Sequence, residues 1–252
     1  MSKPLLGRRA LITGASRGIG AAIARSLSEA GAELGLVARD KAQLDSLAAQ
    51  LPTDCLTISA DLSTVEGVER AASLALESAA QWHILVNNAG VAHQTPLLEE
   101  TAESWDALLG INLRAPMLLA KALVPGMIAS GAGKIINLSS VAAFVGTPGF
   151  SAYAASKAAL NQLTRTMAVE WAPYNIQVNA VCPTVILTDM GRQLWDNPDM
   201  AEARREKMAR IPVHRFGTPE EVADVVLFLA GPKANYVNGV SLPVDGGMLV
   251  SP

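Results

Sequence analysis

TGASRGIG, residues Thr13 to Gly20, is the stretch of sequence that decides the fold. It joins the apolar run ALIT, typical of a strand, to a helical pattern that opens near Arg17. Its three glycines let the backbone approach a pyrophosphate closely, and the first turn of the helix supplies free N–H groups and a positive dipole. We therefore predict a dinucleotide-binding turn, with a tight turn that holds no ligand as the alternative. The predicted contacts are Gly14, Ser16, Arg17, Gly18, Ile19 and Gly20.

Outside this turn, apolar runs of strand length alternate with helical patterns along nearly the whole chain. Such strands indicate a parallel sheet covered by helices on both faces, and right-handed crossovers then give a doubly wound Rossmann fold. No linker, composition break or internal repeat divides the chain, so we predict a single α/β domain over residues 1–252. Its seven parallel strands are expected within residues 10–13, 34–38, 55–60, 84–90, 134–140, 176–181 and 239–247.

One irregular stretch, Thr188 to Arg215, interrupts this alternation. It is rich in charge and carries Trp195, Pro198 and Pro212. Its length and its position after a strand suggest a lid over a site. An ordinary surface insertion is the alternative, and Trp195 would either cap a substrate or anchor the lid.

Composition excludes several classes of function. Charged residues make up 17% of the chain, against roughly 25% in typical domains, so copies of the chain are expected to cover part of the surface. The net charge of −3 leaves no basic footprint for nucleic acid. Cys55 and Cys182 lie far apart and lack metal-ligand spacing, which predicts neither a disulfide nor a metal site. MSKPLLGRR at the start lacks an apolar signal region, and no apolar run approaches the length of a membrane span, so we expect a cytoplasmic protein without a membrane partner.

The end of the second predicted strand decides which dinucleotide fits. An acidic residue there would hydrogen-bond the adenosine 2′-hydroxyl and repel a 2′-phosphate. Here the strand ends at Ala38 and Arg39 follows it, with Arg17 in the glycine loop. Two guanidinium groups match a phosphate bidentately, so we favour NADP(H), with NAD(H) as the alternative. The adjacent Asp40 would weaken this preference, and either arginine is alternatively a solvated surface residue.

A tyrosine and a lysine stand four residues apart in FSAYAASKAAL, residues 150–160. Alanine is the best helix former, and positions i and i+4 share one face, so Tyr153 and Lys157 are expected side by side on a helix. A neighbouring cation favours the phenolate of a tyrosine, whose ordinary pKa is near 10. Tyr153 would then give a proton to a carbonyl or take one from an alcohol. Taken alone, the pair is more readily explained by an amphipathic helix whose polar edge carries both residues.

These motifs together resemble the classical short-chain dehydrogenase/reductase family over nearly the whole chain. In chain order, the resemblance is carried by T-G-x-x-x-G-x-G at 13–20, Asp61-Leu62, Asn87-Asn88-Ala89-Gly90, Asn112, Ser140 and Tyr153-x-x-x-Lys157, with Ser140 13 residues before Tyr153. The segments ARDKAQLDSL and CPTVILTDMG are most similar to the sugar- and dicarbonyl-reducing branch that includes L-xylulose reductase. Pro183-Thr184 departs from the Pro-Gly of most members and would make the floor beside the nicotinamide bulkier.

The resemblance implies an NAD(P)-dependent oxidoreductase that moves a hydride between the nicotinamide and a small ketone, polyol or sugar. Tyr153 would be the general acid/base, and Ser140 would hold the substrate oxygen against it. Lys157 would also grip the nicotinamide ribose, and Asn112 would hold a water that passes the proton onward. Besides Tyr153 and Lys157, the implied cofactor contacts are Asp61 and Leu62 at the adenine, Asn88 at its ribose, Ala89, Gly90, Pro183, and Ile186 with Thr188 at the nicotinamide amide.

Two other functions fit parts of this pattern. A non-catalytic dinucleotide-binding sensor or scaffold would keep the fold, but it would be expected to lose Ser140, Tyr153 or Lys157, and all three are present. A sugar-nucleotide epimerase or dehydratase also uses a Tyr-x-x-x-Lys pair, but needs more substrate-binding chain than the roughly twenty residues after the last predicted helix. His93 either touches substrate or lies in a surface loop, and Cys182 is interpreted as a small packing residue.

The tyrosine-bearing helix is predicted to continue through LNQLTRTMAVEWA, residues 160–172. One face must cover the sheet and another must present Tyr153 and Lys157. The further apolar stripe is expected to point to solvent unless another subunit covers it. With the family resemblance, which implies pairing through this helix and the C-terminal strand, this predicts a homotetramer, with a homodimer as the alternative. The residues of the stripe are Leu160, Leu163, Met167 and Trp171.

Overall fold

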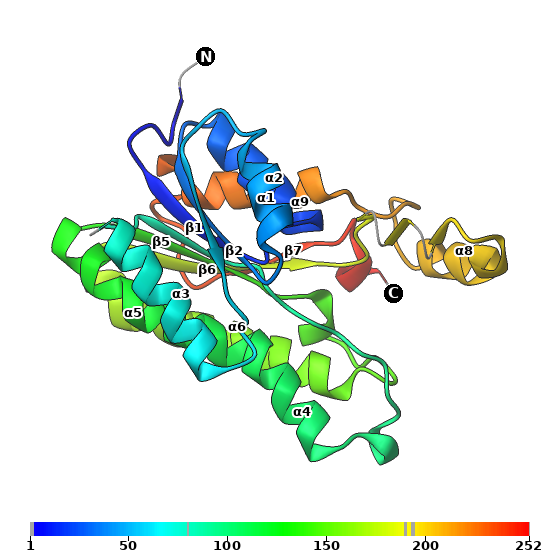
Figure 1. Ribbon diagram of the computed structural model, residues 1–252. Coiled ribbons are helices and arrows are strands. Elements are labelled where there is room, and N and C mark those ends of the chain that lie inside the picture. Colours follow the sequence, from blue (N-terminus) through cyan, green and yellow to red (C-terminus); the bar gives the residue numbers. More distant parts are fainter. Residues whose placement is uncertain (1–2, 80, 189–190, 193–194, 252) are drawn as a thin grey trace.

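The computed structural model describes residues 3–79, 81–188, 191–192 and 195–251. Within them, seven strands form one parallel sheet in the order β3-β2-β1-β4-β5-β6-β7 (Figure 1). The chain runs outward from β1 to β3, crosses back to β4 and continues to β7, which confirms the predicted Rossmann topology. The strands are β1 (Arg9–Thr13), β2 (Glu33–Ala38), β3 (Cys55–Ser59), β4 (Ile84–Asn87), β5 (Gly133–Leu138), β6 (Ile176–Pro183) and β7 (Ser241–Val244).

Helices cover both faces of the sheet, as the continuous apolar strands predicted (Figure 1). One face carries α1 (Gly18–Glu29), α2 (Lys41–Ala48) and α9 (Pro219–Ala230). The other face carries α3 (Val65–Ser78), α5 (Ala115–Ser130) and α6 (Ser151–Trp171).

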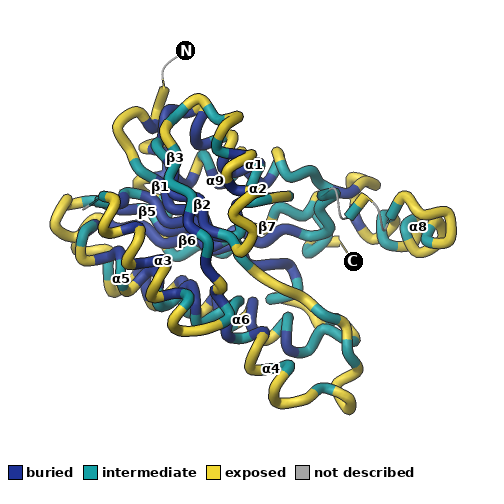
Figure 2. Tube along the Cα trace, viewed as in Figure 1, coloured by how far each residue is buried: buried dark blue, intermediate teal, exposed yellow. Residues whose placement is uncertain are grey.

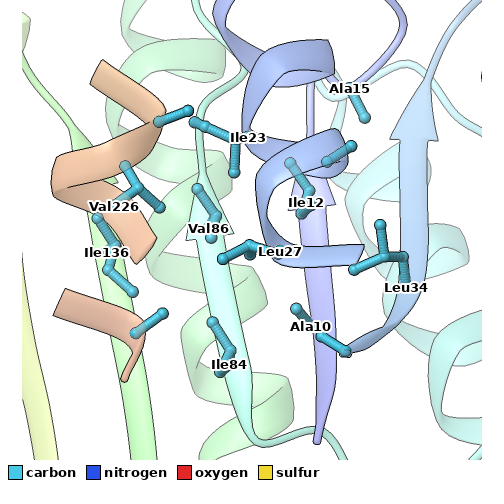
Figure 3. Close-up of a cluster of buried hydrophobic side chains, with 14 of the residues drawn as sticks. Ala10, Ile12, Ala15, Ile23, Leu27, Leu34, Ile84, Val86, Ile136 and Val226 are labelled. Atoms are coloured by element: carbon cyan, nitrogen blue, oxygen red, sulfur yellow. The ribbon is translucent and has the colours of Figure 1, made fainter. Parts of the chain in front are cut away.

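Each face of the sheet has its own apolar core. In the first, Ile23 and Leu27 of α1 and Val226 of α9 pack over the strands β1, β4 and β5 (Figure 3). The second core joins α3, α5 and α6 to the opposite face of the same strands. Strand β6 is buried at all of its eight positions. The sheet is therefore a rigid platform, and its carboxyl edge is where a doubly wound fold binds ligands.

A single helical span runs from Ala102 to Ser130 and contains α4 (Ala102–Leu109), a π-turn η2 (Gly110–Arg114) and α5. By length and composition alone, this span is long and apolar enough to cross a membrane, and it is the one helix among the described residues that meets this criterion. The sequence had not predicted a span of that kind. Half of its most apolar window is buried inside the fold, and Leu119 and Leu123 of α5 belong to the second core. Packing against the sheet accounts for this apolar face.

The apolar stripe predicted on α6 does not face solvent, so that prediction is wrong. Leu160 and Met167 are buried, and Leu163 and Trp171 are partly buried against the second core. The reason is that α6 lies against both β6 and the neighbouring helices, so its inner face is wider than one stripe. The large apolar side chain that α6 does expose is Val169, with 77% of its surface accessible.

Part of the segment predicted as a lid projects from the body of the molecule. Its helix α8 (Ala201–Ala209) has no buried residue among those described and stands apart from the sheet (Figure 2). Residues 189–190 and 193–194 of the predicted lid lie outside the described residues. The described part is anchored at its base, where the rings of Trp195 and Phe216 lie 5.2 Å apart.

Candidate active site

A cleft of about 880 Å³ opens at the carboxyl ends of the central strands. It brings together residues that are distant in the sequence, from the glycine loop to the segment after β6. Other parts of its wall are Ala38, Asp40, Gln43, Ala60, Val91 and Ile111. Thirteen of the predicted cofactor residues line it: Gly14, Ser16, Arg17, Gly18, Ile19, Gly20, Arg39, Asp61, Leu62, Asn88, Ala89, Gly90 and Thr188. The predicted contacts Tyr153, Lys157, Pro183 and Ile186 are not part of this lining.

The glycine loop is built against the end of β4. Gly14 has a φ of +64°, and a Cβ there would lie 2.9 Å from the Cα of Ala89. A Cβ on Gly20 would lie 2.6 Å from Nδ2 of Asn88 and closer still to the carbonyl oxygen of Gly14. Both positions therefore need glycine, because the loop packs tightly against the end of β4 and against itself. The predicted approach of this backbone to a pyrophosphate stays a prediction.

Thr13 and Asn88 hold the loop in this position. Thr13 Oγ1 accepts hydrogen bonds from the backbone N–H groups of Asn88 and Ala89, both at 3.0 Å. Nδ2 of Asn88 donates to the carbonyl oxygens of Thr13 and Gly14, at 2.9 and 3.1 Å. Both amide hydrogens of Asn88 are therefore donated to the loop, and its Oδ1 remains for the predicted ribose contact. Thr13 was missed as a site residue, although it opens the quoted motif.

Two arginines line the cleft, Arg17 from the glycine loop and Arg39 from the end of β2. Arg17 and Arg39 are exposed, and no ion-pair partner of either occurs in the described part of the chain. Asp40 instead caps α2, because its Oδ1 accepts from Gln43 N at 3.0 Å and its Oδ2 accepts from Gln43 Nε2 at 2.8 Å. The carboxylate that was expected to weaken a phosphate site is therefore held by α2.

The predicted catalytic side chains converge where α6 passes the end of β5. Lys157 Nζ lies 5.7 Å from the centre of the Tyr153 ring and donates to the carbonyl oxygen of Leu138 at 2.7 Å. Ser140 follows β5 and caps the short helix η3 (Val141–Ala143) by accepting from Ala142 N. A Cβ on Gly90 would lie 3.4 Å from Lys157 Nζ, so the group adjoins the wall of the cleft.

Burial controls the protonation of this group. The pKa of the Tyr153 phenol is raised, because burial disfavours the phenolate more than the neighbouring Ser140 hydroxyl favours it. Burial also lowers the pKa of Lys157 to about 8, since only 4% of its surface is accessible. The expectation that Lys157 would lower the phenol pKa is therefore not met in this structure, where the desolvated lysine is turned towards Leu138.

Asn112 lies in the π-turn and is fully buried. Its Oδ1 accepts from Val91 N, and its Nδ2 donates to Val91 O, both at 2.9 Å. The same Nδ2 donates to Ser156 Oγ at 3.1 Å, and Ser156 in turn donates to the carbonyl oxygen of Tyr153. Both amide hydrogens are thus used, so a water at Asn112 would have to donate to an oxygen of this residue. Ser156 was missed, and its place just before Lys157 was the available signal.

The segment after β6 returns over the glycine loop. A Cβ on Gly18 would lie 3.0 Å from Cγ2 of Thr188, and Ile186 forms a parallel bridge with Gly217. Pro183 closes β6 and is buried. Thr184, the departure from the family pattern, donates from Oγ1 to Met248 Sδ at 3.1 Å. The hydroxyl of Thr184 is therefore engaged by the C-terminal turn.

The three residues whose roles were left open now have contacts. His93 Nε2 lies 2.9 Å from the Glu100 carboxylate and 3.1 Å from Ser104 Oγ, which ties its loop to the start of α4. Cys182 is buried, and burial raises the pKa of its thiol, as for a packing residue. The ring of Trp195 packs against that of Phe216 at a tilt of 54° at the base of the lid, which favours the anchoring role.

Comparisons with known proteins agree with this geometry. The family model described as enoyl-(acyl carrier protein) reductase matches residues 14–249. The chain is 42% identical over 252 residues to L-xylulose reductase of Bos taurus, with all of both chains covered. It is 38% identical to the NAD-dependent glycerol dehydrogenase of Listeria innocua, covering 96% of this chain and 93% of that one. A crystal structure of a putative NAD(P)-dependent gluconate 5-dehydrogenase from Beutenbergia cavernae, with NADP bound, superposes with a TM-score of 0.91 at 37% identity, covering 100% of both chains.

The chain belongs to the short-chain dehydrogenase/reductase family. It resembles the L-xylulose reductases along its full length, which confirms the similarity predicted from the sequence. The fold, the cleft and the family together define a nicotinamide-dependent oxidoreductase that acts on an alcohol or carbonyl carbon. When bound, the nicotinamide supplies the hydride, and the residues described above would orient the substrate and move its proton.

Proposed function

We propose that this protein interconverts small polyhydroxylated ketones and alcohols, with NADP(H) preferred and Tyr153 as the general acid/base. The observation that carries the proposal is the convergence of Tyr153, Lys157 and Ser140 beside the cleft wall at Gly90. A hydroxyl paired with a second hydroxyl and a buried lysine is suited to passing a proton to or from a substrate oxygen.

The protonation state of Tyr153 in the cofactor-free protein supports reduction of a carbonyl as the favoured direction of the reaction at neutral pH. Because the pKa of Tyr153 is raised above its ordinary value, the phenol is protonated at neutral pH and holds the proton that a carbonyl oxygen needs. The rate of reduction should therefore be sustained at neutral pH and lost only as the pH rises through the phenol pKa. Oxidation of an alcohol needs the opposite state and should be favoured at higher pH.

The substrate class is supported by what the relatives are named for. L-xylulose, glycerol and gluconate all carry a carbonyl or alcohol carbon flanked by further hydroxylated carbons. We extend that shared chemistry to this chain, with Ser140 and Tyr153 binding the reacting oxygen. Ala142 to Phe144 and Phe150 would form the adjoining apolar walls, because Phe150 lies edge-on to Tyr153 with ring centres 6.3 Å apart.

The preference for NADP(H) is supported by Arg17 and Arg39, which line the cleft without an ion-pair partner among the described residues, while Asp40 is held by α2. The negative charge of a 2′-phosphate would pair with the positive charges of these two guanidinium groups. NAD(H) is the competing cofactor, since one relative is named as NAD-dependent.

The test is a panel of substrates followed by nicotinamide absorbance in both directions with both cofactors. We expect turnover of L-xylulose, dihydroxyacetone or 5-keto-gluconate, and a lower kcat/KM for a ring ketone without hydroxyl groups. Tight cofactor binding without any turnover would favour a sensor or scaffold. Product formation without net oxidation or reduction would favour an epimerase.

We also propose that the chain assembles into a homotetramer. The tetramer is supported by the apolar side chains that are exposed on the described surface, since the α6 stripe is buried or partly buried. Val169 and Tyr236 lie at one end of the sheet, where Asn238 joins α6 to the start of β7, and they are 77% and 103% exposed. Leu97 and Leu98, just before α4, form a second exposed pair.

A further inference from the structure

Arg114, the last residue of the π-turn, makes a contact that the proposed chemistry does not use. Its Nη2 donates to the carbonyl oxygen of Ser63 at 2.6 Å. A Cβ on Gly110 would lie 2.8 Å from that Nη2 and 3.1 Å from the same carbonyl oxygen. The guanidinium group therefore lies across Gly110 and reaches the loop between β3 and α3. Its Nε is buried and finds no partner in the described part of the chain.

The two segments that Arg114 joins are neighbouring parts of the cleft wall. Asp61 and Leu62, which precede Ser63, line the cleft, and so does Ile111, which follows Gly110. The Asp61 carboxylate accepts from Ser63 N at 3.0 Å, which is the main cause of its lowered pKa, with a smaller effect from Arg39. The loop is thus bound from its own side at Ser63 N and from the π-turn at Ser63 O.

A buried N–H group without a partner is costly, so a bridge that leaves one in place is not explained by stability alone. We propose that Arg114 is a positioning residue that sets the distance between Leu62 and Ile111 and thereby shapes the pocket for the adenine end of the cofactor. The proposal rests on the proposed function in one respect, namely that the adenine lies at Asp61 and Leu62. It assigns Arg114 no contact with the nicotinamide or the substrate.

Fragments of the cofactor separate this role from a general loss of structure. Arg114→Met removes the donor to Ser63 but keeps the aliphatic stem. A hydrogen bond from a charged group corresponds to about tenfold or more in affinity, so KM for NADPH and the Kd values of 2′,5′-ADP and AMP should each rise about tenfold. Saturating NADPH should restore kcat to within about twofold of the wild type. With reduced nicotinamide mononucleotide, which lacks adenosine, kcat/KM should not change.

Three further variants complete the experiment. Arg114→Lys keeps a donor and should recover part of the lost affinity. Gly110→Ala keeps the arginine but displaces it through the added methyl group, so it should show the same selective loss even if Arg114→Met does not fold. Arg70→Met, on the exposed side of α3, is the matched control and should change nothing.

Unchanged Kd values for AMP and 2′,5′-ADP in both Arg114→Met and Gly110→Ala would overturn the proposal. An equal loss of kcat/KM with the mononucleotide would overturn it too, as would failure of both adenosine fragments to bind the wild type. If no carbonyl compound is turned over by the wild type, the proposed substrate class fails, but the binding comparison of the fragments still decides the role of Arg114.

Discussion

Tyr153 is the residue on which the proposed chemistry depends most directly. Tyr153→Phe removes the hydroxyl group and keeps the ring that packs edge-on against Phe150. We expect turnover to fall by roughly 10²–10⁴, the contribution of a positioned acid/base, while dinucleotide affinity changes by no more than a few-fold. Steady-state kinetics with a parallel cofactor titration checks this. Turnover close to that of the wild type would remove Tyr153 from the role of proton carrier.

Lys157 illustrates the cost of a buried functional charge. Its pKa falls from 10.5 to about 8 because burial disfavours the ammonium. Below pH 8 the folded protein carries this penalty in full, and between about pH 8 and 10.5 the unfolded chain binds the proton more tightly, so stability rises with pH. Relative to Lys157→Met, the cofactor-free wild type should therefore gain about 2–3 kcal/mol between pH 7.5 and 10. Urea unfolding of both proteins at these pH values measures the difference, and parallel pH curves would contradict it.

Arg39 offers a test of cofactor choice at a single position of the cleft. Arg39→Ala should weaken NADPH binding about tenfold or more, the worth of a charge-assisted contact, and leave NADH nearly unaffected. Adding Ala38→Asp should supply an acceptor for a 2′-hydroxyl and invert the preference. Titration of each variant with both cofactors gives the result. Equal affinity of the unmutated protein for NADPH and NADH would show that the two arginines do not form a phosphate site.

Single residues were predictable where their chemistry requires fixed spacing. The glycine loop and the Tyr153–Lys157 pair could be predicted because the regular geometry of a turn or a helix determines which residues close in sequence are also close in space. Thr13 and Arg114 were not, because each acts on main-chain atoms 51–76 residues away. A contact to a backbone group leaves no complementary side chain in the sequence to reveal it.

The π-turn is the element that links the cleft to the tyrosine helix. Asn112→Ala would leave Val91 N, Val91 O and Ser156 Oγ without the partner that they have now. We expect a loss of about 1–3 kcal/mol in the free energy of unfolding, because water replaces only part of these bonds. Asn112→Asp keeps an acceptor for Val91 N but sets a buried carboxylate oxygen against the carbonyl oxygen of Val91, so it should lose at least as much. Chemical denaturation of both variants tests the order, and equal stability of wild type and Asn112→Ala would contradict it.

Elements were predicted well where one structural period dominates the pattern. All seven strands lie where continuous apolar runs placed them, since strands buried on both faces leave no polar alternation. The π-turn was not predicted, because GINLR has the same helical character as its flanks. The stripe on α6 was wrongly assigned to solvent because the number of neighbours around a helix is a property of the fold, which periodicity does not contain.

The cleft is a property of the whole molecule rather than of any one segment. Its wall runs from residue 14 to residue 188 and draws on the ends of four neighbouring strands and the π-turn. Parallel strands deliver their carboxyl ends to one edge of the sheet, so motifs found separately in the sequence had to meet there. Thr184 shows the limit of that argument: its contact with Met248 depends on where the C-terminal turn packs.

Assembly is the remaining property of the whole molecule, and it follows from which apolar side chains the single chain leaves uncovered. A tetramer with two-fold axes needs two self-complementary surfaces on each chain, and we assign these to two of the exposed apolar groups on the described surface, Val169 with Tyr236 and Leu97 with Leu98. Sedimentation at micromolar concentration should give about four times the chain mass of 26.3 kDa. Changing Val169 and Tyr236 to glutamate should leave active dimers, whereas Leu6→Glu, at a separate exposed position, should leave the tetramer intact. A stable, active monomer of the unmutated chain would refute the predicted tetramer. The exposed apolar side chains would then be the isolated ones that are ordinary on a monomer surface.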